Sequence, residues 1–232
     1  MSRVPKHVAI IPDGNRRWSR AHGVPSARGY DRGAERFRDI IRSAFQTSGL
    51  THLTIWAASE SNLTARGPHE VRTLRTLVHR ELQVLRESPD LARYGIRVRI
   101  IGRAAELLKD STITERVHEL MAHTAANKKR NLTVLLGYDG RTEMIEAIRS
   151  MGRDAAHATA SSLHAALWTR DLPPVDLVIR TGGEPHWSAG FLMWLTAESQ
   201  FIFPETLWPD FDGAAFKAAL AEYAARGRRF GA

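Results

Sequence analysis

Short apolar runs alternate along the chain with longer segments whose apolar residues recur at helical spacing. The short runs have the length and continuity of strands buried on both faces, and they cover residues 8–11, 53–58, 96–101, 132–136 and 175–179. The longer segments have the period of amphipathic helices, and they cover residues 31–47, 70–86, 113–127, 142–153 and 213–225. Strands alternating with helices predict an α/β fold, a mostly parallel central sheet flanked by helices.

The chain shows no sign of a domain boundary. No internal repeat and no linker rich in proline, glycine or serine interrupts the alternation, so residues 1–232 are expected to form one domain. A surface connection and a short helix are expected after residue 154, and an aromatic-rich segment covers residues 187–211. No apolar run reaches the roughly eighteen residues of a membrane-spanning helix, and no signal-peptide core is present. The sequence therefore predicts a soluble, cytoplasmic protein with no integral membrane segment.

The composition excludes some kinds of site but does not identify a binding partner. Cysteine is absent, which excludes disulfides, thiolate metal sites and a cysteine nucleophile. The formal net charge of +8 suits nucleic acid, an anionic membrane surface or anionic small substrates. The cluster Lys128, Lys129 and Arg130 ends a predicted helix, where cations complement the helix dipole. We interpret it as a solvated helix end, and with no basic stripe of interleaved aromatic residues, no nucleic-acid partner is expected.

Polar residues follow the first strand at the point where it ends. Pro12 is followed at once by Asp13, Gly14, Asn15, Arg16 and Arg17. Guanidinium groups bind phosphate oxygens bidentately, and a carboxylate is a hard oxygen ligand for Mg²⁺. The mixture predicts an anion bound together with a divalent metal. The alternative is a surface turn in which Asp-Gly-Asn only makes the bend.

The ends of parallel strands meet at one edge of a sheet, where ligands of open α/β proteins bind. Polar residues after the first, second and last of the predicted strands should therefore gather there, and they are Asp13, Asn15, Arg16, Arg17, Ser59, Asn62, Arg66, Arg180 and Ser188. No Walker-type or G-x-G-x-x-G sequence occurs at a strand–helix turn, and the histidines lack zinc-site spacing. This set predicts a site for two anionic groups neutralised by a metal, and it disfavours nucleotide binding.

The segments HVAIIPDGNRRW, SESNLTAR, DLVIRTGGE and LWPDF, in this order, resemble the cis-prenyltransferase family, the fold group of undecaprenyl diphosphate synthase. The resemblance runs from about residue 7 to residue 231, and the spacing RRWSRAHG…GYDRGA is similar to short-chain members that make Z-type farnesyl diphosphate. The family implies a homodimer with a six-stranded parallel sheet. It also implies an apolar tunnel between that sheet and two helices, which holds the prenyl chain.

The resemblance implies a role for individual residues. Asp13 would bind Mg²⁺ and help the allylic diphosphate leave, and Ser59 and Asn62 would assist loss of a proton from the C5 partner. The remaining residues would bind the two prenyl diphosphates, and they are Gly14, Asn15, Arg16, Arg17, Trp18, Ser26, Tyr30, Glu60, Ser61, Arg66, Arg180, His186 and Ser188.

The chain departs from the family pattern at Ser26, Tyr30, Ala58, Leu63, His186 and Gln200. His186 stands where members have a second arginine, and Gln200 stands where a glutamate helps hold the metal. Loss of one charge-assisted diphosphate contact costs on the order of 2 kcal/mol. These changes weaken a normal isopentenyl diphosphate site or reshape it for another C5 donor.

Two reactions therefore stay open. One is regular short-chain synthesis from dimethylallyl or geranyl diphosphate, and the other is head-to-middle coupling of dimethylallyl diphosphate to a lavandulyl-type product. Long-chain synthesis is less favoured. A non-catalytic family subunit is disfavoured because such subunits lose the first-motif aspartate, and Asp13 is present.

Overall fold

The sheet that organises the molecule has all its strands parallel. The computed structural model describes residues 4–226, and within them the strand order is β3-β4-β2-β1-β5-β6. The strands are β1 (His7–Ile11), β2 (His52–Ser59), β3 (Ile96–Ile101), β4 (Arg130–Tyr138), β5 (Leu177–Arg180) and β6 (Gln200–Ile202). The predicted parallel α/β sheet is confirmed, and so is its six-stranded form.

Alternate residues of the central strands enter two different cores, which explains their continuous apolar runs. Val8 and Ile10 of β1 pack into the larger core, whereas Ala9 and Ile11 pack into the smaller one. The larger core lies under the helices α2 (Ser26–Gln46), α4 (Pro68–Arg86), α7 (Ser111–Thr124) and α10 (Gly213–Ala225). The smaller core is covered by irregular chain that includes Phe191. The sheet is therefore helix-covered mainly on one face.

The predicted helices exist, and their boundaries differ from the predictions. Helix α2 begins at Ser26 rather than at residue 31, because two glycines obscure its first turns. A Cβ at Gly29 would lie 2.3 Å from the carbonyl oxygen of Asn15, and one at Gly33 would lie 2.4 Å from Asn15 Oδ1. Helix α1 (Asn15–Ala21) crosses α2 at these glycines, so their small size allows the close approach.

Several short elements were not predicted. The helices α1, α3 (Glu60–Thr64), α5 (Pro89–Arg93) and α6 (Ala104–Leu108) are too short to show a period. The predicted fourth strand, residues 132–136, is shorter than β4, which continues through Gly137 and Tyr138. Gly137 has φ +65°, and a Cβ there would lie 2.7 Å from the backbone nitrogen of Ala104, so the strand ends where α6 begins to pack.

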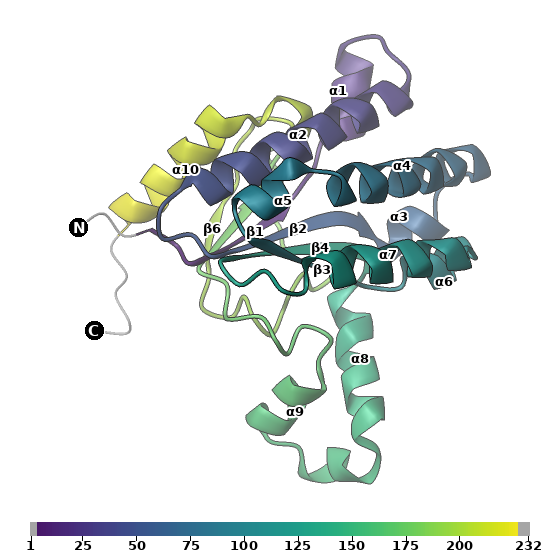
Figure 1. The fold of residues 1–232 in the computed structure, drawn as a ribbon, viewed down its shortest axis with the longest axis vertical. Helices are drawn as coiled ribbons and strands as arrows, with labels where there is room; N and C mark the ends of the chain where they lie inside the picture. The colour runs from purple at the N-terminus through teal and green to yellow at the C-terminus, as the bar shows by residue number, and fades with distance from the viewer. Residues whose placement is uncertain (1–3, 227–232) are drawn as a thin grey trace.

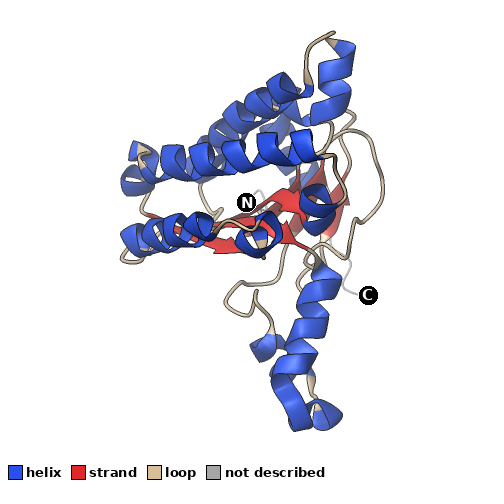
Figure 2. Cartoon of the chain, turned by 90° about the vertical axis from the view of Figure 1, so that its right-hand side faces the viewer, coloured by secondary structure: helices blue, strands red, loops and turns tan. Residues whose placement is uncertain are grey.

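A helical arm projects from the body of the molecule (Figures 1 and 2). It consists of α8 (Gly140–Met151), a 3₁₀ turn (Gly152–His157) and α9 (Ala160–Ala166). Ile145 and Ile148 of α8 are 48% and 43% exposed, which is unusual for large apolar side chains in this protein. Within residues 4–226, none of the helices has both the length and the hydropathy needed to cross a bilayer.

Candidate active site

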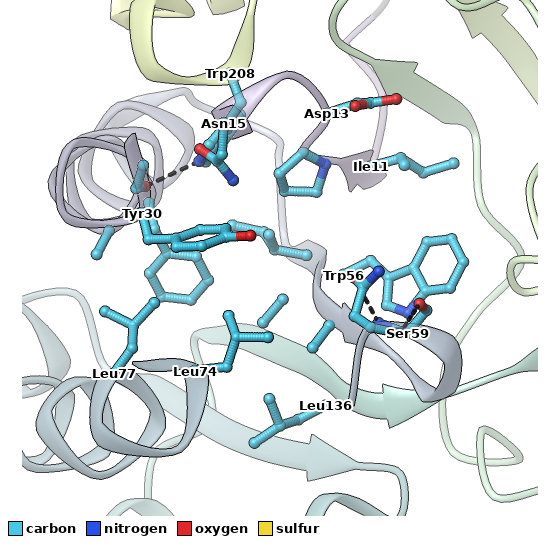
Figure 3. A pocket seen from close by; sticks show the side chains of 18 of the residues that line it. Ile11, Asp13, Asn15, Tyr30, Trp56, Ser59, Leu74, Leu77, Leu136 and Trp208 are labelled. Carbon is cyan, nitrogen blue, oxygen red and sulfur yellow. Dashed lines mark hydrogen bonds between the residues drawn. The ribbon is translucent and has the colours of Figure 1, made fainter. Parts of the chain in front are cut away.

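A cavity of about 580 Å³ opens at the edge of the sheet where β1, β2 and β5 end. Its inner wall is apolar and includes Phe37 of α2, Leu74 and Leu77 of α4, and Leu136 of β4. Figure 3 shows Tyr30 with Leu74 and Leu77 on one side and Trp56 with Ser59 of β2 on the other. The cavity therefore lies between the sheet and two helices, as the resemblance implied for the tunnel.

Most of the predicted site residues line this cavity. They are Asp13, Gly14, Asn15, Arg16, Arg17, Tyr30, Ser59, Ser61, Asn62, Arg66, Arg180 and Ser188. They come from the ends of three strands and from the segments after them, which is the convergence that a parallel sheet predicts. Trp18, Ser26, Glu60 and His186 do not line it.

Asp13 is held at the cavity mouth by contacts from the end of β5. Its backbone nitrogen donates to Thr181 Oγ1 at 2.8 Å, and Thr181 Oγ1 donates to the Asp13 carbonyl oxygen at 2.9 Å. Its carboxylate accepts a 2.9 Å hydrogen bond from Arg180 Nη2 and lies 3.3 Å from Arg17 Nη2. The one aspartate of the first motif is thus surrounded by guanidinium groups.

Gly14 joins Asp13 to helix α1 in a conformation that requires glycine. Its φ is +112°, and a Cβ there would lie 2.7 Å from Leu207 Cδ2. The next residue of the LWPDF segment, Trp208, donates from its backbone nitrogen to the Asp13 carbonyl oxygen at 2.8 Å. Its indole Nε1 donates to the Gly33 carbonyl oxygen at 2.9 Å. Trp208, for which no role was predicted, therefore ties the first motif to α2.

The mouth carries more positive than negative charge. Arg16, Arg17, Arg66 and Arg180 all line it, and Arg180 is only 6% exposed. The Nε of Arg180 is buried and makes no hydrogen bond to the residues described here. A buried donor without a partner is costly, so this atom fits an anion bound at the mouth.

Tyr30, Arg66 and Glu70 form a hydrogen-bonded group at the rim. Arg66 Nη1 donates to the Tyr30 hydroxyl and, at 2.8 Å, to Glu70 Oε1, while the Tyr30 hydroxyl donates to Glu70. Burial raises the pKa of Tyr30 to about 12, so its proton is retained. Glu70 was not predicted as a site residue, because Arg66 lies before α4 and the four-residue spacing indicates a pair only within a helix.

Ser59 and Asn62 hold each other as well as lining the cavity. They form a capping box at the start of α3, in which Asn62 N donates to Ser59 Oγ at 3.1 Å. The Ser59 backbone nitrogen donates to Asn62 Oδ1 at 3.3 Å. Ser61 Oγ lies 2.9 Å from Ser59 Oγ. The local sequence therefore fixes these polar atoms at the end of β2.

The loop that carries Ser188 has an unusual backbone. Ala189 and Leu192 adopt φ of +44° and +47°, which is sparsely populated for residues with a side chain. The Ala189 carbonyl accepts a 3.0 Å hydrogen bond from Gly140 N at the start of α8, and a Cβ at Gly140 would lie 1.9 Å from the Gly190 oxygen. Close packing against the arm therefore supports the shape of this loop.

Trp18 and Glu60, both predicted to bind substrate, make contacts elsewhere. Trp18 Nε1 donates to Asp210 Oδ1 at 2.9 Å, and the ring stacks on His22 with centroids 4.1 Å apart. Glu60 accepts a 2.9 Å hydrogen bond from Thr142 Oγ1 of α8. Both partners are distant in sequence, so the local motif did not reveal them.

Of the six departures from the family pattern, Tyr30, Ala58 and Leu63 line the cavity, whereas Ser26, His186 and Gln200 do not. Ser26 is the exposed first residue of α2. The His186 side chain is 57% exposed, and its backbone carbonyl accepts a 3.0 Å hydrogen bond from Arg180 Nη1. Gln200 pairs with Leu177 at the start of β5, whereas Arg180 ends that strand, so Gln200 lies away from Asp13 within this chain.

The donor set suits Mg²⁺ only together with a bound anion. No three His, Asp or Glu side chains of residues 4–226 cluster in a way that could enclose a metal. Asp13 supplies one carboxylate, and Glu184, missed by the sequence analysis, lies 3.3 Å from Arg17. Because Mg²⁺ is commonly bound by one or two carboxylates plus substrate phosphates, Asp13 fits a metal that arrives with a diphosphate.

A cationic mouth and an apolar interior define a binding site for a molecule with an anionic head and a hydrocarbon tail. The family model described as putative undecaprenyl diphosphate synthase matches residues 11–231. The chain belongs to this family, and it is a cis-prenyltransferase. The resemblance seen in the motifs is thereby confirmed.

Individual relatives align over nearly the whole chain. An isoprenyl transferase of Agrobacterium fabrum is 39% identical over 238 residues, which cover 100% of this chain and 94% of that protein. A Thermobifida fusca protein named trans,polycis-polyprenyl diphosphate synthase ((2Z,6E)-farnesyl diphosphate specific) is 36% identical, over 98% of this chain and 81% of its own.

Solved structures share the fold. Lavandulyl diphosphate synthase from Lavandula x intermedia, in complex with dimethylallyl diphosphate, has a TM-score of 0.87 and 30% identity, and 99% of each chain is covered. A probable undecaprenyl diphosphate synthase from Campylobacter jejuni has a TM-score of 0.80 over 100% of both chains. At 23% identity, the second likeness concerns the fold alone.

Proposed function

We propose that this chain is a Mg²⁺-dependent, short-chain prenyltransferase that condenses dimethylallyl or geranyl diphosphate with a C5 prenyl diphosphate and releases diphosphate. The observation that carries the proposal is one cavity of about 580 Å³ lined by five arginines (Arg16, Arg17, Arg20, Arg66 and Arg180), with Asp13 beside them and apolar side chains inside. Arginines at the mouth suit the diphosphates, and the interior suits the hydrocarbon.

In this proposal the C–O bond of the allylic diphosphate breaks, and its electron pair leaves with the diphosphate. Arg16, Arg17 and Arg66 stabilise the charge that grows on the leaving group, and Mg²⁺ held by Asp13 would neutralise part of it. The double bond of the C5 partner supplies the electron pair of the new C–C bond. Ser59 and Asn62 then assist loss of a proton, which restores a double bond.

Arg180 and Ser188 are proposed to hold the second diphosphate. The buried, unpartnered Nε of Arg180 and the position of Ser188 on the cavity wall support this assignment. The remaining candidates on the wall, Gly14, Asn15, Tyr30 and Ser61, would contact the allylic substrate.

Irregular head-to-middle coupling of dimethylallyl diphosphate is the second candidate. It is favoured by His186, which stands where family members have a second arginine and whose exposed side chain does not line the cavity. The likeness to a lavandulyl diphosphate synthase points the same way.

Product analysis tests the proposal and separates the two candidates. The purified protein is incubated with Mg²⁺ and dimethylallyl or geranyl diphosphate, with and without isopentenyl diphosphate, and the products are identified by mass spectrometry and NMR. Linear products that require isopentenyl diphosphate support regular condensation, and branched products formed without it support irregular coupling. No diphosphate release from any combination would overturn the proposed activity.

We also propose that the active form is a homodimer and that one domain spans the chain. Ile145 and Ile148 project from the arm as exposed apolar side chains on one helix face, and a second copy of the chain is the proposed cover.

A further inference from the structure

A carboxylate stands in the apolar wall of the cavity. Helix α4 presents Leu77, Val78, Leu82 and Leu85 to this wall, and Glu81 lines it among them. The Glu81 side chain is only 21% exposed. Placing a charge beside hydrocarbon is unfavourable unless the charge is paired, so the position of Glu81 calls for a specific reason.

Glu81 is paired with the other helix of the cavity roof. Arg38 Nη1 of α2 donates to Glu81 Oε2 at 2.5 Å, and Arg80 Nε donates to Glu81 Oε1 at 3.0 Å. Arg80 also binds Asp31 of α2 at 2.8 Å. Helices α2 and α4 lie next to each other in Figure 1 and are in contact, so these charges close the seam between them.

The pair lies deep along the helix rather than at the mouth. Glu70 belongs to the rim group with Tyr30 and Arg66, and Glu81 follows it by eleven residues on the same helix. A rise of 1.5 Å per residue places Glu81 about 16 Å farther along α4. The residue before Arg38, Phe37, also lines the cavity. The seam is therefore closed beside the hydrocarbon end of a bound substrate.

We propose that Arg38 and Glu81 set the upper length of the prenyl chain by closing the seam between α2 and α4 with paired charges. This inference rests on the proposed function and deepens it, since it assigns the site to short allylic diphosphates. The cavity wall continues past Glu81 to Leu82 and Leu85, so a chain too long for the cavity would press on this seam between the helices. Such a chain would then separate the two charges or remove them from water. Hydrocarbon forms no hydrogen bond or ion pair that could offset the free-energy cost of either change.

The test replaces the pair by hydrocarbon and measures binding separately from turnover. The double variant Arg38→Leu/Glu81→Leu keeps bulk in the seam and removes both charges, so neither is left unpaired. Its affinities for dimethylallyl and geranylgeranyl diphosphates are measured by calorimetry, and its fold is checked by circular dichroism. We expect the ratio of long-chain to short-chain affinity to rise about tenfold.

The matched control is Arg42→Leu/Asp90→Leu. Arg42 Nε lies 3.1 Å from Asp90 Oδ2 and joins α2 to α5, and neither residue lines the cavity. The control should keep the wild-type affinity ratio. Glu81→Gln, which removes one charge and retains a hydrogen-bonding group, should give a smaller rise than the double variant.

Product length provides the second reading. With excess isopentenyl diphosphate, the double variant should release products longer than those of the wild type. A folded double variant with the wild-type affinity ratio would overturn the assigned role of the pair. Because that measurement needs no turnover, it stays distinct from failure of the proposed function, which would appear as a wild-type protein that releases no diphosphate.

Discussion

Asp13 and Arg180 lie 167 positions apart in the sequence, and a 2.9 Å hydrogen bond joins Asp13 Oδ2 to Arg180 Nη2. The parallel register of β1 and β5 brings them together, because Ile11 is opposite Arg180. Arg180 is nearly buried, whereas the Asp13 side chain is 32% exposed toward the cavity mouth. The pair therefore presents an acid to the mouth and keeps a guanidinium group behind it.

Asp13→Asn should lower turnover by about a hundredfold or more, since it removes the carboxylate that would hold the metal at the leaving group. The asparagine carbonyl can still accept the Arg180 hydrogen bond, so the melting temperature should change little. Steady-state release of diphosphate and thermal unfolding are the measurements. Asp13→Ala should lose turnover equally and cost more stability. Wild-type turnover in either variant contradicts the role of Asp13.

Tyr30→Phe should raise the KM for the allylic diphosphate about tenfold, because the hydroxyl that accepts from Arg66 and donates to Glu70 is lost and only the direct Arg66–Glu70 contact remains to hold Arg66. The pKa of Tyr30 is raised to about 12 by burial, so the residue does not titrate near neutral pH. The variant should therefore change the level of the pH–rate profile and leave its shape unaltered.

Tyr94→Phe is the control for this substitution. Tyr94 also accepts a hydrogen bond through its hydroxyl, from Gln46 Nε2 at 3.2 Å, and it does not line the cavity. Its KM should equal that of the wild type. Equal KM values in all three proteins would mean that the rim group does not position Arg66 for substrate.

The sequence predicted those features that short-range patterns encode. Continuous apolar runs located the longer strands, and the parallel sheet then placed Asp13, Ser59 and Arg180 at one edge. Strand β6 was not found from an apolar run, because it has only three residues and one of them is the polar Gln200. The helical period of α4 predicted its apolar face. It could not predict that Glu81 also lines the cavity beside that face, because Glu81 is paired there with Arg38 of α2.

Side-chain direction was the part of the site that the motifs could not predict. Trp18 turns toward Asp210, 192 positions away, and Glu60 toward Thr142, 82 positions away. These contacts depend on packing of α1 and α8, which the local sequence around Trp18 and Glu60 does not encode. Residues at the strand ends themselves were predicted correctly to lie at the cavity, as Ser59, the last residue of β2, illustrates.

His7 should make the fold sensitive to mild acid. The ring is fully buried in β1, where Nδ1 donates to the Pro173 carbonyl oxygen at 2.9 Å and Nε2 accepts from Thr54 Oγ1 at 2.8 Å. Burial lowers its pKa from 6.5 to about 4. The unfolded chain therefore binds a proton between these values that the folded chain does not, and stability falls as the pH falls through this range.

Urea unfolding at two pH values measures this effect. The free energy of unfolding attributable to His7 should be about 2 kcal/mol lower at pH 5 than at pH 7. His7→Gln, which cannot titrate, should be less stable at pH 7 and should lose correspondingly less on acidification. Identical pH dependence in the two proteins would show that His7 does not contribute.

The exposed isoleucines of the arm should control assembly. Ile145 and Ile148 are three residues apart on α8, so they occupy one face of the helix, and they are exposed in the single chain. Burial of this face against a second copy would remove apolar surface from water. Ile145→Glu/Ile148→Glu should therefore convert the proposed dimer to a monomer in sedimentation velocity.

Arg149→Glu changes the net charge by the same amount on an exposed neighbour, so it controls for charge and should remain dimeric. A double variant that sediments as a dimer would place the interface elsewhere, and a monomeric wild type would remove the homodimer from the proposal.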